Sequence, residues 1–313
     1  MVRIRCIGVA LATLVALASA PQLLAAEPQQ GKVSRDGFEL HYRVVGETGP
    51  YVVVLAGGPG LDVDYMESVT GELAREHRVV LLEQRGTGRS RLPKLDETTL
   101  GWDAYLGDLE ALRAHLGEEK LTLLGHSWGM TYALAYAGEH PERTRGVVTL
   151  GSAPITADFM LLFGDNRRSR LHPSERELLD FWSVPERWAA DPDRALLGYL
   201  QAITPTDFFD RAKGIEHAAR WRLEWCHGAI GDVVDKTIWA GLDLRPQLER
   251  ITAPVLLVHG YQDVAGEANV LEAAAHIERA TVKFVHRCGH YPWLDQPEET
   301  WAAVLPFLAG LGD

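Results

Sequence analysis

The sequence predicts an α/β fold with a mostly parallel sheet and a helical insertion. Continuous apolar runs, which are typical of strands buried on both faces, occur at Tyr51–Leu55 and Arg78–Leu82. Helical patterns alternate with such runs, and this alternation indicates parallel strands joined by helices. The alternation stops after Ser152 and resumes at Pro254, so a segment of different character divides the core into two parts.

The overall composition is that of an acidic globular protein. The chain has 313 residues, of which 46% are hydrophobic and 24% charged, enough for one large core or a core with an insertion. Its formal net charge of −12 gives no electrostatic support for nucleic-acid binding, and an acidic membrane surface would repel it. The same charge favours a cationic substrate.

The first 26 residues predict a secretory signal peptide. Arg3 and Arg5 precede an apolar stretch over residues 7–17, and small residues follow as far as Ala26. The apolar stretch is shorter than the roughly 20 residues of a membrane-spanning helix. We therefore expect a periplasmic or secreted protein with no stable membrane association after the signal is cleaved. Cys226 and Cys288 would then lie in an oxidising compartment, either paired or as two separate buried thiols.

The first part of the core, residues 27–152, begins with a predicted hairpin. Residues 33–45 alternate in polarity around Asp36 and Gly37, which is typical of a tight turn between two strands. The buried strand at Tyr51–Leu55 comes next and ends in a glycine-rich loop. After the strand at Arg78–Leu82, the helical pattern of Trp102–Leu116 leads to a further strand that begins at Leu121.

The insertion, residues 153–245, has the character of a helical cap over a core. Aromatic and charged residues occur there at helical spacing, and no buried-strand run is present. Prolines divide the segment at residues 154, 173, 185, 192 and 205. The second part of the core, residues 246–313, resumes with predicted strands at 254–260 and Ala280–Val285. A closing helix follows, for which Asp295 is the expected N-cap and Pro297 a first-turn residue.

The strand that begins at Leu121 ends in Gly125-His-Ser127-Trp-Gly129, and a helical pattern follows over residues 131–140. In a G-x-S-x-G turn between a strand and a helix, the serine hydroxyl projects away from the sheet as a nucleophile. The backbone N–H of the next residue, Trp128, then points toward the space where an oxyanion would develop. The alternative is a serine in an ordinary turn.

A serine nucleophile needs a base, and the base needs an acid that fixes its tautomer. In this architecture the acid and then the histidine follow later strands, and Asp263 and His290 stand at those positions. His286 is the competing base, but it falls where the last strand should still be running. A surface or capping role is the alternative for Asp263. His126 and His259 are expected to be packing residues.

The loop after the first buried strand predicts the second oxyanion donor. A backbone without side chains at Gly57 and Gly58 can approach a substrate closely, and the Gly58 N–H is the expected donor. The alternative is a glycine-rich turn with no donor role.

Together these motifs resemble the proline iminopeptidase (prolyl aminopeptidase) branch of the α/β-hydrolase superfamily. The resemblance covers nearly the whole mature chain outside the cap. The motifs that carry it are Gly57-Gly-Pro-Gly60, Gln84-Arg-Gly-Thr-Gly-Arg-Ser90 and Gly-His-Ser127-Trp-Gly-Met. The chain departs from the family pattern at Ala56, Glu83 and His126, changes that bear on the substrate and leave the reaction type unchanged.

The resemblance implies an eight-stranded core, a helical cap over the site and a Ser127, Asp263, His290 triad. It also implies an oxyanion hole from Gly58 and Trp128, no metal or cofactor, and removal of an N-terminal residue, preferentially proline. The substrate would be a small molecule or short peptide with a free amino terminus.

Members of this family use carboxylates of the cap to hold the substrate amine, because a buried ammonium requires such a partner. Placed at helical spacing, Trp221, Glu224 and Trp225 fall near one face and would put an acid between two indoles. The alternative is an amphipathic cap helix that packs its tryptophans on the core.

Three functions therefore stay open. The first is an exported iminopeptidase that forms an acyl-enzyme on Ser127. The second is an esterase, lactonase or other small-molecule amide hydrolase with the same triad. The third is a binding module without catalysis, against which the intact serine, acid and histidine argue.

Overall fold

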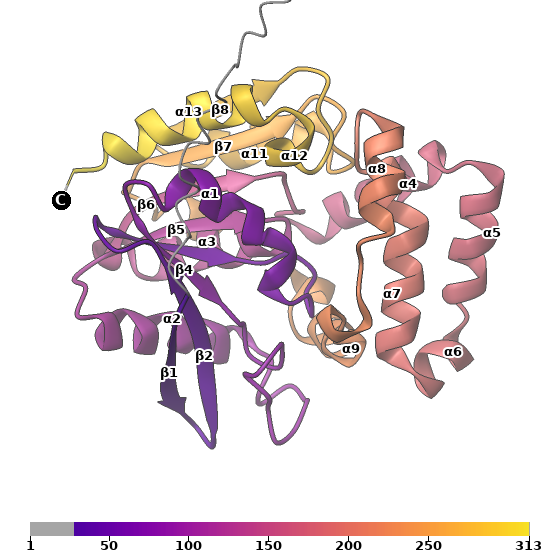
Figure 1. Ribbon diagram of the computed structural model, residues 1–313, viewed down its shortest axis with the longest axis horizontal. Helices are drawn as coiled ribbons and strands as arrows, with labels where there is room; N and C mark the ends of the chain where they lie inside the picture. Colours follow the sequence, from indigo (N-terminus) through magenta and orange to yellow (C-terminus); the bar gives the residue numbers. More distant parts are fainter. Residues whose placement is uncertain (1–27, 313) are drawn as a thin grey trace, which may run out of the picture.

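One eight-stranded sheet forms the centre of the protein in the computed structural model, which describes residues 28–312 (Figure 1). The predicted signal peptide, residues 1–26, lies outside the described residues. The strands are β1 (Gln29–Arg35), β2 (Phe38–Val45), β3 (Tyr51–Leu55), β4 (Arg78–Leu82), β5 (Leu121–His126), β6 (Thr144–Leu150), β7 (Val255–Gly260) and β8 (Ala280–Val285). Their spatial order is β1-β2-β4-β3-β5-β6-β7-β8.

The sheet is antiparallel at one edge and parallel elsewhere. β1 pairs with β2, and β2 with β4, in antiparallel register, while all pairings from β4 to β8 are parallel. The central strands are apolar on both faces because helices cover both sides: along β3, Val53 and Leu55 belong to one hydrophobic cluster and Val52 and Val54 to the other. The predicted fold class is confirmed.

The two clusters are completed by helices of the core. One face carries α2 (Trp102–Leu116), α3 (Trp128–Glu139), α10 (Arg245–Leu248) and α11 (Glu267–Ala275). The other face carries α1 (Thr70–Leu73), α12 (Pro292–Asp295) and α13 (Pro297–Ala309). Within the described chain, no helix is long and apolar enough to cross a membrane.

The helices between β6 and α10, which we call the cap, stand to one side of the sheet (Figure 1). They are α4 (Ala157–Arg170), α5 (Pro173–Trp182), α6 (Pro185–Ala190), α7 (Pro192–Ile203), α8 (Arg211–Ala218) and α9 (Gly228–Thr237). Prolines occupy the first turns of α5, α6 and α7, where the missing N–H has no helical partner to lose. Three of the five prolines that divide the cap sequence therefore mark starts of α-helices.

Asp295, the expected N-cap of the last helix, has another role in the structure. Asp295 does not cap α13, because its carboxylate accepts the backbone N–H groups of Phe209 and Gly289, both at 2.8 Å, and Gln296 takes the capping position.

Cys226 and Cys288 are both buried free thiols, so the alternative of two separate thiols holds. Burial raises the pKa of Cys226 to about 12.

A buried ion pair fixes the loop that follows β4. The Arg85 guanidinium donates to both carboxylate oxygens of Asp108 on α2, at 2.8 and 2.6 Å, and Arg35 of β1 donates to the same carboxylate at 2.9 Å. Arg85 and Asp108 are almost fully buried. A complete buried ion pair changes the free energy of unfolding little. Removal of one partner lowers it strongly, because the other charge then stays buried without a partner.

We expect Asp108→Ala to lower the free energy of unfolding by about 3–5 kcal/mol, since Arg85 would lose its counter-ion inside the protein. Urea unfolding followed by circular dichroism measures this. Asp103→Ala, at an exposed position on the same helix, is the control and should cost about 1 kcal/mol or less. Equal losses in the two variants would contradict the role given to Asp108.

Candidate active site

Ser127 lies at the sharp turn between β5 and α3, as the motif predicts. Its backbone has φ 52° and ψ −122°, a conformation that is strained for a residue with a side chain. A Cβ atom at Gly129 would collide with the carbonyl oxygen of Leu55, so glycine there lets α3 pack directly against β3. The turn is thus held by close backbone packing, and Ser127 lines a cavity of the protein.

His290 and Asp263 meet at the carboxyl ends of the last two strands. The His290 Nδ1 atom lies 2.9 Å from Asp263 Oδ1, and both side chains are buried. Because an ionised carboxylate only accepts, Nδ1 carries the proton and Nε2 is left as the basic nitrogen. His290 lines the same cavity as Ser127. His286, the competing base, is exposed and packs on Tyr261 outside this cavity.

The Asp263 carboxylate stays ionised. Burial acts to raise its pKa, but His290, His259 and the N–H of Ala265 more than offset burial, so the pKa lies below its usual range. The backbone N–H of Ser152 also donates to the carboxylate, at 3.0 Å. His259, expected to pack, lies beside this carboxylate and hydrogen-bonds to the Ser152 hydroxyl at 2.8 Å.

Two acidic residues that sequence reasoning missed hold the loop before His290. The backbone carbonyl of Asp207, in the cap, accepts the His290 N–H at 2.6 Å. The Asp295 carboxylate accepts the Gly289 N–H at 2.8 Å. Neither residue belongs to a motif, and Asp295 resembles a helix cap in sequence, so no local signal marked them. Together they position the imidazole.

The glycine-rich loop after β3 faces the turn at Ser127, which we call the elbow. The Gly57 N–H donates to the Tyr65 hydroxyl at 2.6 Å, so it is not free for a substrate. Gly58 has φ 116°, which glycine adopts readily, and among residues 28–312 no acceptor lies within hydrogen-bond distance of its N–H. Gly58 also lines the cavity beside Trp128. This arrangement supports the predicted pair of oxyanion donors.

Gln84 connects the two loops that carry these donors. Its side-chain amide donates to the Ala56 carbonyl and accepts the indole N–H of Trp128, both at 2.9 Å. Glu83 binds Arg89 through both the guanidinium and the backbone N–H. The motifs at 56–60, 83–90 and 126–129 therefore form one hydrogen-bonded unit.

His126 is buried and uses both ring nitrogens. Nε2 lies 3.1 Å from the carbonyl oxygen of His290, and Nδ1 lies 2.6 Å from the Tyr65 hydroxyl. Since a carbonyl only accepts, Nε2 carries the proton and Nδ1 accepts from Tyr65. Burial, followed by the nearby His290, lowers the pKa of His126 well below its usual range. His126 is thus a neutral connection between the Gly57 loop and the His290 loop.

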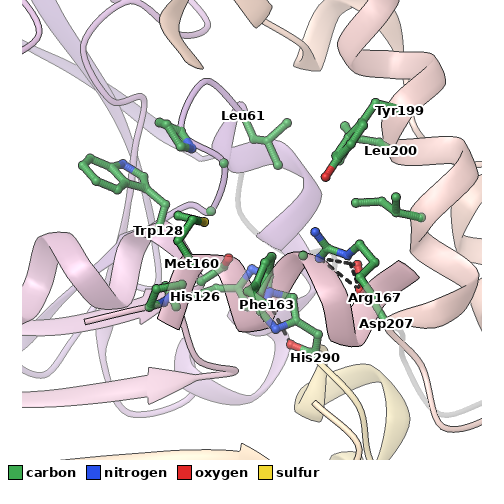
Figure 2. A pocket seen from close by; sticks show the side chains of 18 of the residues that line it. Leu61, His126, Trp128, Met160, Phe163, Arg167, Tyr199, Leu200, Asp207 and His290 are labelled. Atoms are coloured by element: carbon green, nitrogen blue, oxygen red, sulfur yellow. Dashed lines mark hydrogen bonds and ion pairs between the residues drawn. The ribbon is translucent and has the colours of Figure 1, made fainter. Parts of the chain in front are cut away.

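The cavity has a volume of about 340 Å³ and lies between the elbow and the cap (Figure 2). Apolar side chains form much of its wall: Leu61, Met160, Phe163, Leu196, Leu200, Ile203 and Trp239. Its polar groups, besides Ser127 and His290, include Arg167 of α4, Tyr199 of α7, Asp207 and Asp235 of α9. Arg167 and Asp207 form a buried ion pair, with the guanidinium Nη2 at 3.1 Å from Oδ1.

Asp235 is the carboxylate of this cavity that has no ion-pair partner within the described residues. It lies at an exposed position while lining the cavity, which places it at the opening. Partial burial and the neighbouring Asp232 raise the pKa of its carboxyl, and Lys236 acts against them.

The structure does not place Glu224 in the cavity. α8 ends at Ala218, and residues Leu223–Trp225 form a separate 3-10 turn, so the helical spacing assumed for this segment does not exist. The Glu224 side chain is 68% exposed and, with Trp225, lines a surface groove instead. Trp221 is buried and donates its indole N–H to the Thr204 hydroxyl at 2.8 Å. The prediction of an amine site at Trp221, Glu224 and Trp225 is therefore wrong.

The fold and this arrangement define a hydrolase, and the chain belongs to the alpha/beta hydrolase fold family, whose model matches residues 50–297. A proline iminopeptidase of Lactobacillus helveticus is 27% identical over 299 residues, which cover 89% of this chain and 97% of that protein. The resemblance to proline iminopeptidases is confirmed over most of the chain.

Two solved structures have a similar fold. A proline iminopeptidase-related protein of Thermus thermophilus superposes with a TM-score of 0.70 at 27% identity, covering 91% of this chain and 98% of its own. An esterase from a Rhodococcus species also gives a TM-score of 0.70, at 22% identity, covering 91% of this chain and 99% of its own. The second likeness concerns the fold alone.

Asp295→Ala should lower kcat about tenfold to a hundredfold with little change in KM, because the His290 loop loses an anchor while the cavity wall stays intact. Steady-state kinetics on an aryl ester measures this. Asp295→Asn keeps an acceptor oxygen and should recover most of kcat, and Glu298→Ala, exposed on the next helix, is the unchanged control. A purely structural role would instead lower stability and leave kcat per folded molecule unaltered.

Proposed function

We propose that this hydrolase is an exported aminopeptidase that removes an N-terminal residue, preferentially proline, from short peptides. The observation that carries the proposal is a cavity that brings together Ser127, the His290–Asp263 pair and the unpaired carboxylate of Asp235. The likeness to proteins named proline iminopeptidase, over nine-tenths of the chain, agrees with it. Export rests on the predicted signal peptide alone.

The proposed reaction begins with attack of the Ser127 hydroxyl on the scissile carbonyl, while His290 Nε2 takes the hydroxyl proton. Asp263 stabilises the imidazolium through Nδ1. The N–H groups of Gly58 and Trp128 stabilise the negative oxygen of the tetrahedral intermediate. The intermediate then expels the leaving amine, which takes the proton from His290, and an ester of Ser127 remains. Water, activated by His290, releases the amino acid and restores the serine.

Asp235 takes the role that the sequence suggested for Glu224. A free amino terminus is cationic, and it needs a negative partner when it enters an apolar cavity. Asp207 is a poor candidate, because Arg167 already occupies its carboxylate. Asp235 lines the same cavity without such a partner in residues 28–312. The net charge of −12 also favours a cationic substrate.

An esterase acting on an uncharged small molecule is the second candidate. The observation that favours it is the predominance of apolar side chains in the cavity wall, which bind uncharged acyl groups as well as a proline ring. The two candidates share the nucleophilic chemistry at Ser127. They differ in the leaving group, an amine or an alcohol, and in the need for a free amine on the substrate.

Ser127→Ala should reduce turnover by about 10⁴-fold or more on any substrate, because no other serine, threonine or cysteine of the described chain lines the cavity. Its free energy of unfolding should change by no more than about 1 kcal/mol, since only one hydroxyl is lost. Steady-state kinetics and thermal unfolding measure these two quantities, and active-site titration with an organophosphonate shows whether the variant still carries a reactive nucleophile. Labelling of the alanine variant would show that the nucleophile lies elsewhere.

Asp235→Asn should raise KM for a proline arylamide about tenfold to a hundredfold, the loss expected for one charge-assisted hydrogen bond. A short-chain aryl ester without an amine should be cleaved as before. Asp232→Asn, three residues earlier on α9 and exposed, is the matched control, and Glu224→Gln should also have no effect. Equal losses on amide and ester would remove Asp235 from the amine site.

Blocking the substrate amine separates the two candidate functions directly. The wild-type protein should cleave a proline arylamide much faster than its N-acetylated form, because acetylation removes the charge that Asp235 would bind. Comparable kcat/KM values for the two compounds would favour the esterase or general amidase.

A further inference from the structure

The ion pair in the cavity wall leaves part of its guanidinium unused. Arg167 donates to Asp207 through Nε, at 3.2 Å from Oδ1, and through Nη2, at 3.1 and 3.2 Å from the two carboxylate oxygens. Its third nitrogen, Nη1, has no acceptor within hydrogen-bond distance among the described residues. The Arg167 residue is only 8% exposed, and it lines the cavity. Two charged N–H groups therefore face the cavity without a partner.

Tyr199 presents a second unused donor to the same space. In Figure 2, the Tyr199 hydroxyl and the outer nitrogen of Arg167 point into the same part of the cavity. Burial acts to lower the pKa of Arg167, but Asp207 and the tyrosines Tyr199 and Tyr291 together raise it above its usual range. Within residues 28–312, the Tyr199 hydroxyl has no hydrogen-bond partner. Both groups call for a hydrogen-bond acceptor that the protein itself does not supply.

The guanidinium is also held rigidly. Asp207 binds one side of the guanidinium, and the Cζ atom of Arg167 lies 4.3 Å from the centroid of the Phe163 ring. The direction of Nη1 is therefore fixed before a ligand binds. A planar guanidinium with a free edge binds carboxylates especially well. Preorganised donors of this kind raise affinity because little side-chain freedom is lost on binding.

The cavity thus carries two unmatched kinds of polar group, donors at Arg167 and Tyr199 and a carboxylate at Asp235, and Ser127 lines the same cavity. A ligand that matches both is cationic at one end and anionic at the other. A dipeptide has its amine, its scissile bond and its terminal carboxylate in that order. The volume of about 340 Å³ is at the small end of ligand sites, which favours so short a peptide.

We propose that Arg167 Nη1 and the Tyr199 hydroxyl form a subsite for the C-terminal carboxylate of a dipeptide substrate. This inference rests on the proposed aminopeptidase function and narrows it from peptides in general to dipeptides. The leaving group is then a free amino acid, whose carboxylate stays on Arg167 until the ester of Ser127 has formed.

The test compares prolyl-alanine with prolyl-alaninamide, two substrates that differ only in the terminal charge. In the wild-type protein, kcat/KM should be about tenfold or more higher for the free dipeptide. A ratio of one or below would overturn the subsite. Because the ratio is taken within one protein preparation, partial unfolding does not alter it.

Two variants locate the preference. Tyr199→Phe removes the hydroxyl without touching the ion pair and should lower the ratio severalfold. Arg167→Lys keeps a cation beside Asp207 but removes the free edge of the guanidinium, and it should bring the ratio close to one. Arg168→Lys, at the exposed neighbouring position that pairs with Asp180, is the matched control and should keep the wild-type ratio. An unchanged ratio in Tyr199→Phe and Arg167→Lys would overturn the assignment to these residues.

Failure of the subsite is distinguishable from failure of the proposed function. If neither peptide is cleaved, both can be measured as competitive inhibitors of aryl ester hydrolysis. A lower inhibition constant for prolyl-alanine, lost in Tyr199→Phe, would keep the carboxylate subsite and reject the peptidase. Equal inhibition constants would reject the subsite. Cleavage of both peptides at equal rates would keep the peptidase and reject the subsite.

Discussion

The backbone conformation of Ser127 is the constraint on which the site depends. A residue with a side chain holds φ 52° only where its surroundings leave no alternative, and here β3, β5 and α3 pack too closely for the turn to relax. Hydrogen bonds of Gln84 and His126 connect the elbow to the loop after β4 and to the His290 loop. The strain and the polar network around it serve one purpose, to fix several backbone groups around a single hydroxyl.

Much of the fold and the core of the site could be predicted because their signals are local. Buried parallel strands have apolar runs, and each run ends where the chain reaches the same edge of the sheet. Ser127, Asp263 and His290 each follow such a strand, so topology alone brings them to one edge. The geometry between His290 and Asp263 agrees with that reasoning.

The cap was less predictable because no sheet fixes its register. Glu224 was expected on a continuous helix, but the chain leaves the helix after Ala218, and a lone acid carries no sign of which way it will face. Asp235 on α9 is likewise a lone acid, and its sequence context does not show that it lines the cavity. Asp207 contacts His290, which is far away in sequence, and Asp295 joins the nearby Gly289 to the distant Phe209; periodicity reveals none of these contacts.

Asp207 serves both parts of the molecule at once. Its carboxylate holds Arg167 in the cap, and its carbonyl oxygen holds the backbone of His290 in the core. The cap is therefore not an interchangeable module. A chimera that grafts another hydrolase's cap onto this core must place a backbone carbonyl within hydrogen-bond distance of the His290 N–H. Otherwise the grafted cap would leave the imidazole without its support.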